Sequence, residues 1–285
     1  MKMTARTCLV LAMAFLLTSQ LTAQEPEKFL LRYQWKKGDV LQWDVTHRNR
    51  TTTMVAETTE AVDTACHSLK QWEVESVDEN GTGTIVNTVL WADMREMRDD
   101  GQMHTYDSRK ETIPGEGFET VPASLNRPLA KIRINTLGKQ VSREDYHATT
   151  IVQQANQAYV CVSFPEEAIP VGYSWTIPYP IYVPQASGTL RRIEMRQKFT
   201  LSKVENGIAT IAYSTRVLTP LGDDRATLAQ VMDRLYTGTF LFDITNGRTI
   251  LLTQKVDEMV LGFRGEVSRL KMLIEFNERM LFDEK

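Results

Sequence analysis

Hydrophobic and polar residues alternate along most of the chain, a pattern typical of β-strands with one buried face. The alternation is clearest near residue 195, where Ile193, Met195, Phe199 and Leu201 share one parity and charged residues occupy most positions between them. The same period of two runs through residues 29–35 and 41–46. Each run predicts a strand with one side toward a core and the other toward water.

Short glycine-containing turns separate these runs. They are Asn80-Gly81, Asp100-Gly101, Leu137-Gly138, Asn206-Gly207 and Asn246-Gly247. Asn-Gly is a strong hairpin signal because both residues tolerate positive φ. The turns therefore predict an antiparallel meander. Since many intervening runs reach ten residues or more, a large curved sheet or half-barrel is favoured over a sandwich of short strands.

Three segments depart from the period of two. Residues 228–235 have apolar positions at helical spacing, with Asp223 or Asp224 as the N-cap, and residues 148–159 repeat that spacing. Residues 113–128 are rich in proline and glycine and predict a loop with at most one helical turn. The predicted fold class is therefore all-β with a few short helices.

Similar stretches in the two halves of the chain suggest an internal duplication. The sequence from Gln71 through Asn80-Gly81 resembles that from Lys198 through Asn206-Gly207. Two related β halves, residues 24–162 and 163–285, are one interpretation. A single continuous domain is the other, because any two antiparallel meanders look alike at this level of detail.

The N-terminus has the features of a secretory signal peptide, assigned to residues 1–23. Lys2 and Arg6 precede an unbroken apolar run, Cys8–Leu17, which is too short to span a bilayer. We expect cleavage near Ala23. Leu21 occupies a position where a small residue is preferred, so an uncleaved signal anchor is the alternative. No second apolar run approaches a membrane span. The signal-peptide features predict an extracytoplasmic location, either periplasmic or secreted.

The balance of charges bears on whether the protein binds nucleic acid. The chain has 33 Lys and Arg against 36 Asp and Glu, and loss of Lys2 and Arg6 would make the balance more negative. Nucleic-acid binding is therefore disfavoured.

Cys66 and Cys161 remain after cleavage of the signal peptide, and they are either joined by a disulfide in an oxidising compartment or free thiols on separate strands.

Four places in the chain resemble a family of uncharacterised secreted bacterial proteins. They are the opening LRYQWKKGDVLQWDVTH from Leu31, YDSRK from Tyr106, FPEEAIPVGYSW from Phe164, and GTFLFDITNGRTI from Gly238 with VLGFRGEVS from Val260. The resemblance implies a shared fold. The family has no established activity, so it supplies no functional residues, and Tyr173 stands where an acidic residue is usual.

No catalytic constellation emerges from the sequence. The chain lacks H-x-H, H-E-x-x-H, C-x-x-C and G-x-S-x-G patterns and any glycine-rich phosphate loop, so no cofactor, metal or catalytic residue is predicted. The best local cluster is Glu144, Asp145 and His147, which could hold a metal if the sheet brought it beside residues 104–107. Solvated polar residues at strand ends are the simpler interpretation.

The aromatic residues suggest a binding function. Trp43, Trp72 and Trp91 fall in predicted strands, where they either line a cleft for an apolar ligand or belong to an ordinary core. Tyr179 and Tyr182 lie in a proline-rich segment that must form a sheet edge or rim, since proline lacks the ladder donor. The leading hypothesis is a non-catalytic exported protein that binds an apolar small molecule or a cell-envelope partner. The alternative is an envelope hydrolase or metal-dependent enzyme.

Overall fold

The computed structural model describes residues 26–147, 156, 161–185 and 187–282. The predicted signal segment lies outside this range, and so does the helix predicted over 148–159 apart from Asn156. Nearly all regular structure in the described residues is β-strand, which confirms the predicted fold class.

The strands fall into two successive groups. The first group is β1 (Lys28–Phe29), β2 (Val40–Val55), β3 (Thr58–Val77), β4 (Gly83–Met97), β5 (Met103–Asp107), β6 (Pro128–Ile134) and β7 (Gln140–Asp145). The second group is β8 (Ile169–Pro170), β9 (Ser174–Pro184), β10 (Leu190–Glu205), β11 (Ile208–Val217), β12 (Thr237–Asp243), β13 (Arg248–Leu261) and β14 (Ser268–Leu281). The helical elements are η1 (Val121–Ser124), α2 (Arg225–Val231) and η2 (Met232–Arg234).

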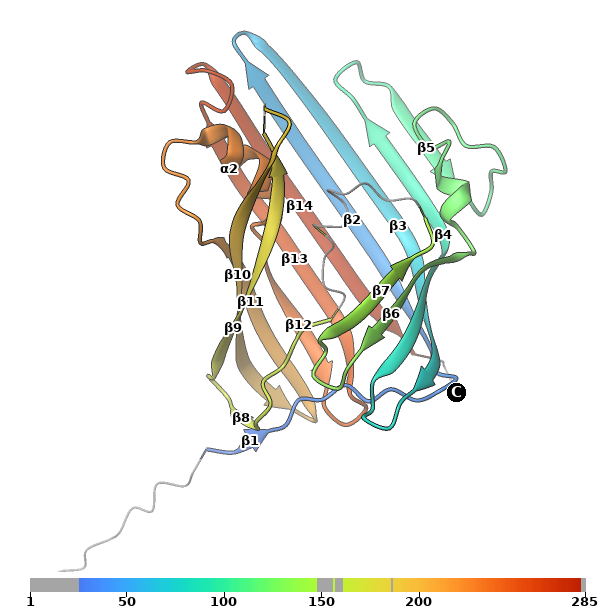
Figure 1. Cartoon of the computed structure of the whole chain (residues 1–285). Coiled ribbons are helices and arrows are strands. Elements are labelled where there is room, and N and C mark those ends of the chain that lie inside the picture. Colours follow the sequence, from blue (N-terminus) through green and yellow to red (C-terminus); the bar gives the residue numbers. More distant parts are fainter. Residues whose placement is uncertain (1–25, 148–155, 157–160, 186, 283–285) are drawn as a thin grey trace, which may run out of the picture.

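All strands except β1 and β8 form one 12-stranded antiparallel sheet in the order β7-β6-β4-β3-β2-β14-β13-β12-β11-β10-β9, with β5 also paired to β4. The first group and the second group each supply one continuous flank, and the β2–β14 pair joins them. The two flanks curl toward the same side, as Figure 1 shows. Among the described residues no pairing connects the edges β7 and β9, so the sheet is an open half-barrel.

Each predicted glycine turn connects two neighbouring strands, which confirms the meander. At the β10–β11 turn both Asn206 and Gly207 have positive φ, 51° and 77°, as a tight hairpin requires. The proline-rich segment is β9, an edge strand, as its missing backbone donors predict. Asp224 caps α2 by accepting a hydrogen bond from the Thr227 amide at 2.9 Å, so one of the two predicted N-caps is confirmed.

The strand predicted over residues 29–35 is mostly wrong. Only Lys28–Phe29 pairs, with β8, and the chain beyond it crosses one end of the half-barrel in an extended but unpaired conformation. Its backbone bonds to turns, with the Tyr33 amide donating to Thr136 and the Gln34 amide to Gly247. The alternation survives because Leu31 still faces the core. A buried face predicts an extended segment but does not show what it pairs with.

The two flanks open with the same hydrogen-bonded arrangement. Gly38 donates to the Val74 carbonyl and Val74 donates back to Asp39, whereas Gly172 donates to Leu201 and Leu201 donates back to Tyr173. Val74 and Leu201 occupy matching positions in the duplication suggested by the sequence, because each lies three residues after the start of its stretch. The division into two related halves stays a prediction, but both halves contribute to one sheet and one main core.

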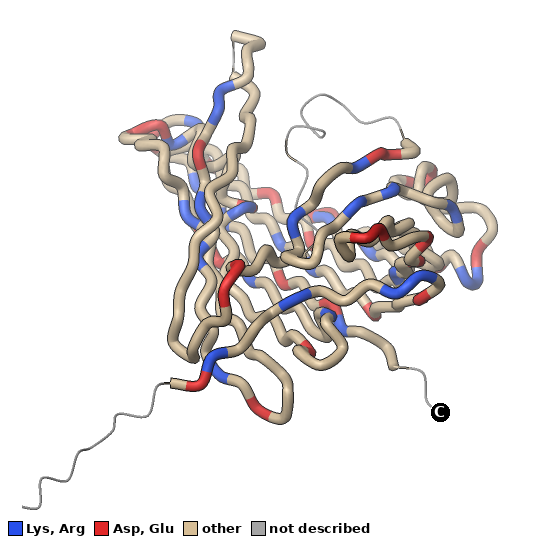
Figure 2. Tube along the Cα trace, turned by 60° about the horizontal axis from the view of Figure 1, so that its bottom comes forward, with Lys and Arg blue, Asp and Glu red and all other residues tan. Residues whose placement is uncertain are grey.

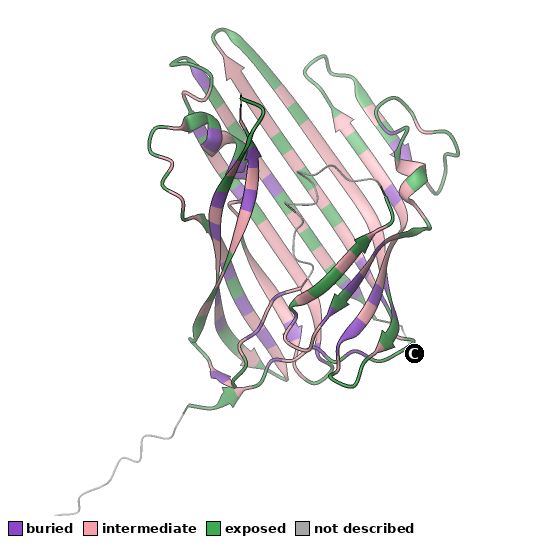
Figure 3. Ribbon diagram, viewed as in Figure 1, coloured by how far each residue is buried: buried purple, intermediate pink, exposed green. Residues whose placement is uncertain are grey.

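Buried side chains gather toward the closed end of the half-barrel, where the N-terminal segment crosses (Figure 3). A second, smaller cluster joins Ile193 and Met195 of β10 to Val231 at the end of α2. Positive and negative side chains are interspersed along the chain, without a long run of one sign (Figure 2). No helix in the described part is long and apolar enough to span a membrane.

Candidate functional site: the inner side of the half-barrel

Aromatic side chains fill the closed end of the half-barrel. Tyr33 stacks on Trp35 at a ring-centroid distance of 5.3 Å, and Trp43 meets Trp72 edge-on at 4.7 Å. The cavity left between them has a volume of about 20 Å³, which suits a single water molecule. Trp43 and Trp72 therefore belong to the core, the simpler of the two roles that the sequence left open for them.

An ion pair lies against this aromatic cluster. Lys70 of β3 bonds to Glu278 of β14, and the two side chains are only 18% and 15% exposed. The Lys70 ammonium also lies 4.8 Å from the ring centroids of Trp43 and Trp72, within cation–π range. This pair was not among the candidate residues predicted from the sequence. One sequence signal could have identified Lys70. It has the same parity as Trp72, so it lies on the buried side of its strand, where the neighbouring side chains are uncharged.

Both described cysteines are free thiols. Cys161 borders the small cavity beside Tyr33, and burial raises its pKa to about 12. Cys66 lies further along β3, where burial raises its thiol pKa as well. Neither thiol is therefore an activated nucleophile at neutral pH.

Above the aromatic cluster, the inner side of β14, β2 and β3 is free of charge, and the neighbouring strand β13 places one carboxylate, Glu258, opposite Met272. Strand parity and the buried core residues Trp43 and Met280 identify this side. We call it the inner wall: Leu270, Met272, Ile274 and Phe276 of β14, His47, Asn49, Thr51 and Thr53 of β2, and Val62, Thr64, Cys66 and Ser68 of β3. None of these is Lys, Arg, Asp or Glu, and most are only partly buried.

The opposite, outer side of the same strands is charged. On β14 it carries Arg269, Lys271, Glu275 and Arg279, which alternate with the inner-wall residues. His47 on the inner wall lies 6.2 Å from the Phe276 ring, and burial lowers its pKa, so the neutral imidazole is favoured. The two sides of the central sheet therefore differ sharply in polarity.

Trp91 lies on the outer side, away from Trp43 and Trp72. A β-bulge causes this, because Lys70 pairs with Val89 whereas Leu69 pairs with Trp91, leaving one extra residue in β4. The ring of Trp91 is covered by Arg109, whose guanidinium carbon lies 4.0 Å from the centroid. The structure thus does not bring Trp91 together with the other two tryptophans.

Tyr179 and Tyr182 lie on the edge strand β9 and also point to different sides. Tyr179 packs near the second core cluster, and burial raises its pKa to about 12. The backbone of Tyr182 is bonded on both its amide and its carbonyl, at 2.7 Å each, by the side-chain amide of Asn156. The five aromatic residues selected from the sequence therefore do not form one site.

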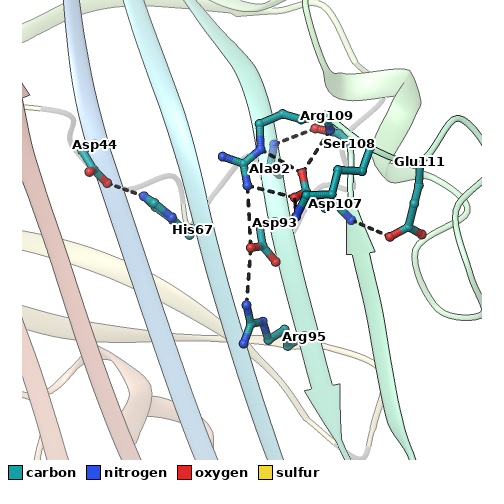
Figure 4. A network of polar contacts seen from close by, with 10 residues as sticks. Asp44, His67, Ala92, Asp93, Arg95, Asp107, Ser108, Arg109 and Glu111 are labelled. Carbon is teal, nitrogen blue, oxygen red and sulfur yellow. Dashed lines mark hydrogen bonds and ion pairs between the residues drawn. The ribbon is translucent and has the colours of Figure 1, made fainter.

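A polar network occupies the outer side of β4 and β5 (Figure 4). Arg109 binds Asp107 in a bidentate manner at 2.8 and 3.0 Å, and Lys110 adds a contact at 2.8 Å. These hydrogen bonds hold the pKa of Asp107 well below its usual range. Asp44 and His67 form a neighbouring pair at 2.7 Å. Asp107 is thus a permanently charged anchor for this turn and a poor general base.

The metal hypothesis from the sequence finds no support in the described residues, which contain no group of three or more His, Cys, Asp or Glu side chains that could hold an ion. Asp145 instead pairs with Arg143 at 2.8 Å, and Glu144 is directly opposite Lys131 in the β6–β7 ladder.

Comparison with known proteins gives a likeness of fold alone. The chain matches no protein-family model and no curated protein. Among solved structures it resembles lipovitellin, in a structure that concerns lipid–protein interactions in lipovitellin, with a TM-score of 0.50 at 7% sequence identity. The match covers 87% of this chain but 26% of that one, so the chain spans about a quarter of lipovitellin. DynF from the dynemicin biosynthesis pathway of Micromonospora chersina matches with a TM-score of 0.23 at 6% identity, over 90% of each chain.

Proposed function

We propose that this protein binds an apolar small molecule, such as a lipid, along the inner wall of its half-barrel. The observation that carries the proposal is the contrast in charge between the two sides of the central strands. An uncharged and partly exposed surface on the hollow side of an open sheet suits an apolar ligand. If the same surface carried charged groups, an apolar ligand would remove water from them and offer no hydrogen-bond partner in return. The fold likeness to lipovitellin agrees with such a function.

The ligand would lie above the aromatic cluster rather than within it. The cavity between the aromatic rings holds about 20 Å³, far less than the several hundred Å³ typical of a ligand site. The aromatic cluster is a packed core below the proposed site, and the inner wall of β14, β2 and β3 supplies the contact surface. This proposal replaces the site of five aromatic residues with one made mainly of aliphatic, methionine and threonine side chains.

Two neighbouring residues of β14 give a matched test. Met272 faces the inner wall, whereas Leu273 faces the outer side, and both are partly buried. Met272→Lys should weaken binding of a fluorescent fatty-acid probe at least tenfold, because it places a charge against the apolar ligand, a cost of at least about 1.4 kcal/mol. Leu273→Lys should leave the affinity unchanged.

Native mass spectrometry and organic extraction of protein purified from its own envelope should show a co-purifying apolar molecule. A ligand-free protein that also binds no fluorescent lipid at micromolar concentration would contradict the proposal. A role in presenting the sheet to a cell-envelope partner would then lead. No observation on the described residues favours the alternative of a hydrolase or metal-dependent enzyme.

The proposal includes a location outside the cytoplasm, which is supported by the charged and apolar pattern of residues 1–23. N-terminal sequencing of the extracytoplasmic fraction should begin near Gln24. Recovery of the protein from the cytoplasm with Met1 intact would exclude this part of the proposal.

A further inference from the structure

The outer side of the central sheet carries a row of short polar side chains that runs across the strands. In the ladder, Thr239 lies opposite Thr253, Thr253 opposite Asn277, and Asn277 opposite Thr46. The row continues from Thr46 to His67 and from His67 to Asp93. We call this row, which extends from β12 to β4, the polar row. At an inter-strand spacing of about 4.8 Å it is about 24 Å long.

The polar row forms the floor of a trough. A hollow of about 620 Å³ lies over its β12–β2 portion, and another of about 240 Å³ lies over its β2–β4 portion. Both hollows include Thr46 and Arg48 in their lining, so they adjoin one another. The trough exists because the residues of the floor are short, while the next row along the strands contains the long side chains of Arg48, Glu275 and Lys255.

The side chains in the trough offer hydrogen-bond donors and acceptors in alternation. Each threonine hydroxyl can donate and accept, and so can the amide of Asn277. Among the described residues, the side chains of Arg48 and Asn277 have no hydrogen-bond or ion-pair partner. These two groups are therefore available to a ligand without breaking an existing interaction.

The charges at the border of the trough and at the β4 end of its floor have both signs. Arg48 and Lys255 lie beside Glu275, and Arg95 lies 3.6 Å from Asp93. A polyanion would meet the carboxylates of Glu275 and Asp93. An apolar ligand would leave the hydroxyls of Thr46 and Thr239 and the amide of Asn277 without partners, at a cost of about 1–3 kcal/mol for each buried group. A neutral molecule with many hydroxyl groups avoids both penalties.

The geometry points to a second binding site, in which the outer trough binds a neutral oligosaccharide chain lying across the strands along the polar row. Each sugar unit presents hydroxyls that can both donate and accept, matching the floor of threonines and Asn277. Arg48 and Glu275 at the border add charge-assisted hydrogen bonds to the same hydroxyls. This site is on the side of the sheet opposite the inner wall, so it stands independently of apolar-ligand binding.

A glycan array tests the site. The full-length protein should bind neutral oligosaccharides of the glucan, mannan or chitin type in preference to polyuronic and sulfated chains. Asn277→Leu and Thr253→Val should each lower the affinity for the bound neutral glycan at least tenfold. Thr52→Val is the matched control, because Thr52 lies on the same side of β2 as Thr46 but beyond the trough, opposite Lys271. The affinity of this variant for the glycan should equal that of the unaltered protein.

Thermal melting of each variant establishes that the sheet is intact, which is expected because none of these side chains is buried. The inference is overturned if no neutral glycan binds, if only polyanionic glycans bind, or if the two trough variants bind as well as the Thr52→Val control. None of these results depends on whether the inner wall binds a lipid.

Discussion

Lys70 and Glu278 form an ion pair on the inner side of the sheet, where Lys70 comes from the first flank and Glu278 from the second. The strand between them, β2, belongs to the first flank and carries Trp43, over which the ammonium lies. The pair therefore bridges the junction of the two flanks at the boundary between the aromatic cluster and the inner wall. Its position links the stability of the aromatic cluster to the surface proposed to bind the ligand.

Removing one member of this pair should destabilise the protein more than removing both. Lys70→Met leaves the Glu278 carboxylate with little solvent, and we expect a loss of about 2–4 kcal/mol in the free energy of unfolding. Lys70→Met combined with Glu278→Met should recover at least about 1 kcal/mol of that loss. Urea unfolding followed by tryptophan fluorescence measures both quantities. A double variant no more stable than Lys70→Met would show that the charge pairing contributes little.

Gly138 should be irreplaceable because the segment that contains Val162 packs directly against its backbone. It has a φ of 78°, and a Cβ there would lie 2.1 Å from the carbonyl oxygen of Val162. Gly138→Ala should therefore cost about 3 kcal/mol or more, from backbone strain together with displacement of the Val162 segment.

Gly172→Ala is the matched control for this prediction, because Gly172 has a φ of 89° but open space where the Cβ would be. It should cost only about 1 kcal/mol. Equal losses in the two variants, measured by urea unfolding, would mean that the contact with Val162 has no energetic weight.

The turns could be predicted from the sequence because their cause is local. A glycine at positive φ is required wherever a tight hairpin forms, so Asn206-Gly207 identifies its turn without reference to the rest of the chain. The alternating strands and the cap at Asp224 follow from equally local rules. These signals were sufficient for the fold class.

The candidate site could not be predicted in the same way, because it depends on register. One extra residue in β4 turns Trp91 to the outer side, although its spacing from Asn87 and Val89 gives it inner parity in the sequence. The polar row likewise exists only once Thr46, Asn277 and Thr253 are aligned by strand pairing. Residues so far apart in the chain reveal no common surface until the ladder is known.

Asp224 should stabilise α2 more than its neighbour Asp223 does. Asp224 accepts the Thr227 amide and also pairs with Arg191 at 2.5 Å, whereas the Asp223 side chain is fully exposed. Asp224→Ala should lower the free energy of unfolding by about 1–2 kcal/mol, and Asp223→Ala by less than about 0.5 kcal/mol. Thermal unfolding compares the two. A larger effect at Asp223 would contradict the assigned cap.

Alkaline pH should destabilise the folded protein through Cys161. Burial raises the pKa of this thiol from an ordinary value of 9.0 to about 12, so the folded state keeps its proton after the unfolded chain has lost it. The stabilisation is complete below about pH 9 and is lost as the pH rises toward 12, with a slope of up to about 1.4 kcal/mol per pH unit. The buried tyrosine Tyr33, whose pKa is also raised, adds to the loss above pH 10.

Urea unfolding at intervals between pH 8 and pH 11 measures this dependence. Cys161→Ala should reduce the slope between pH 9 and pH 11, since its side chain has no proton to lose, even though the variant starts from a lower stability at pH 8. Cys66→Ala is the comparison and should change the slope less, because the Cys66 thiol, whose pKa burial also raises, is less enclosed by the protein. If Cys161→Ala and the unaltered protein have parallel profiles across this range, the Cys161 thiol does not sit in the buried position beside Tyr33 that the fold assigns to it.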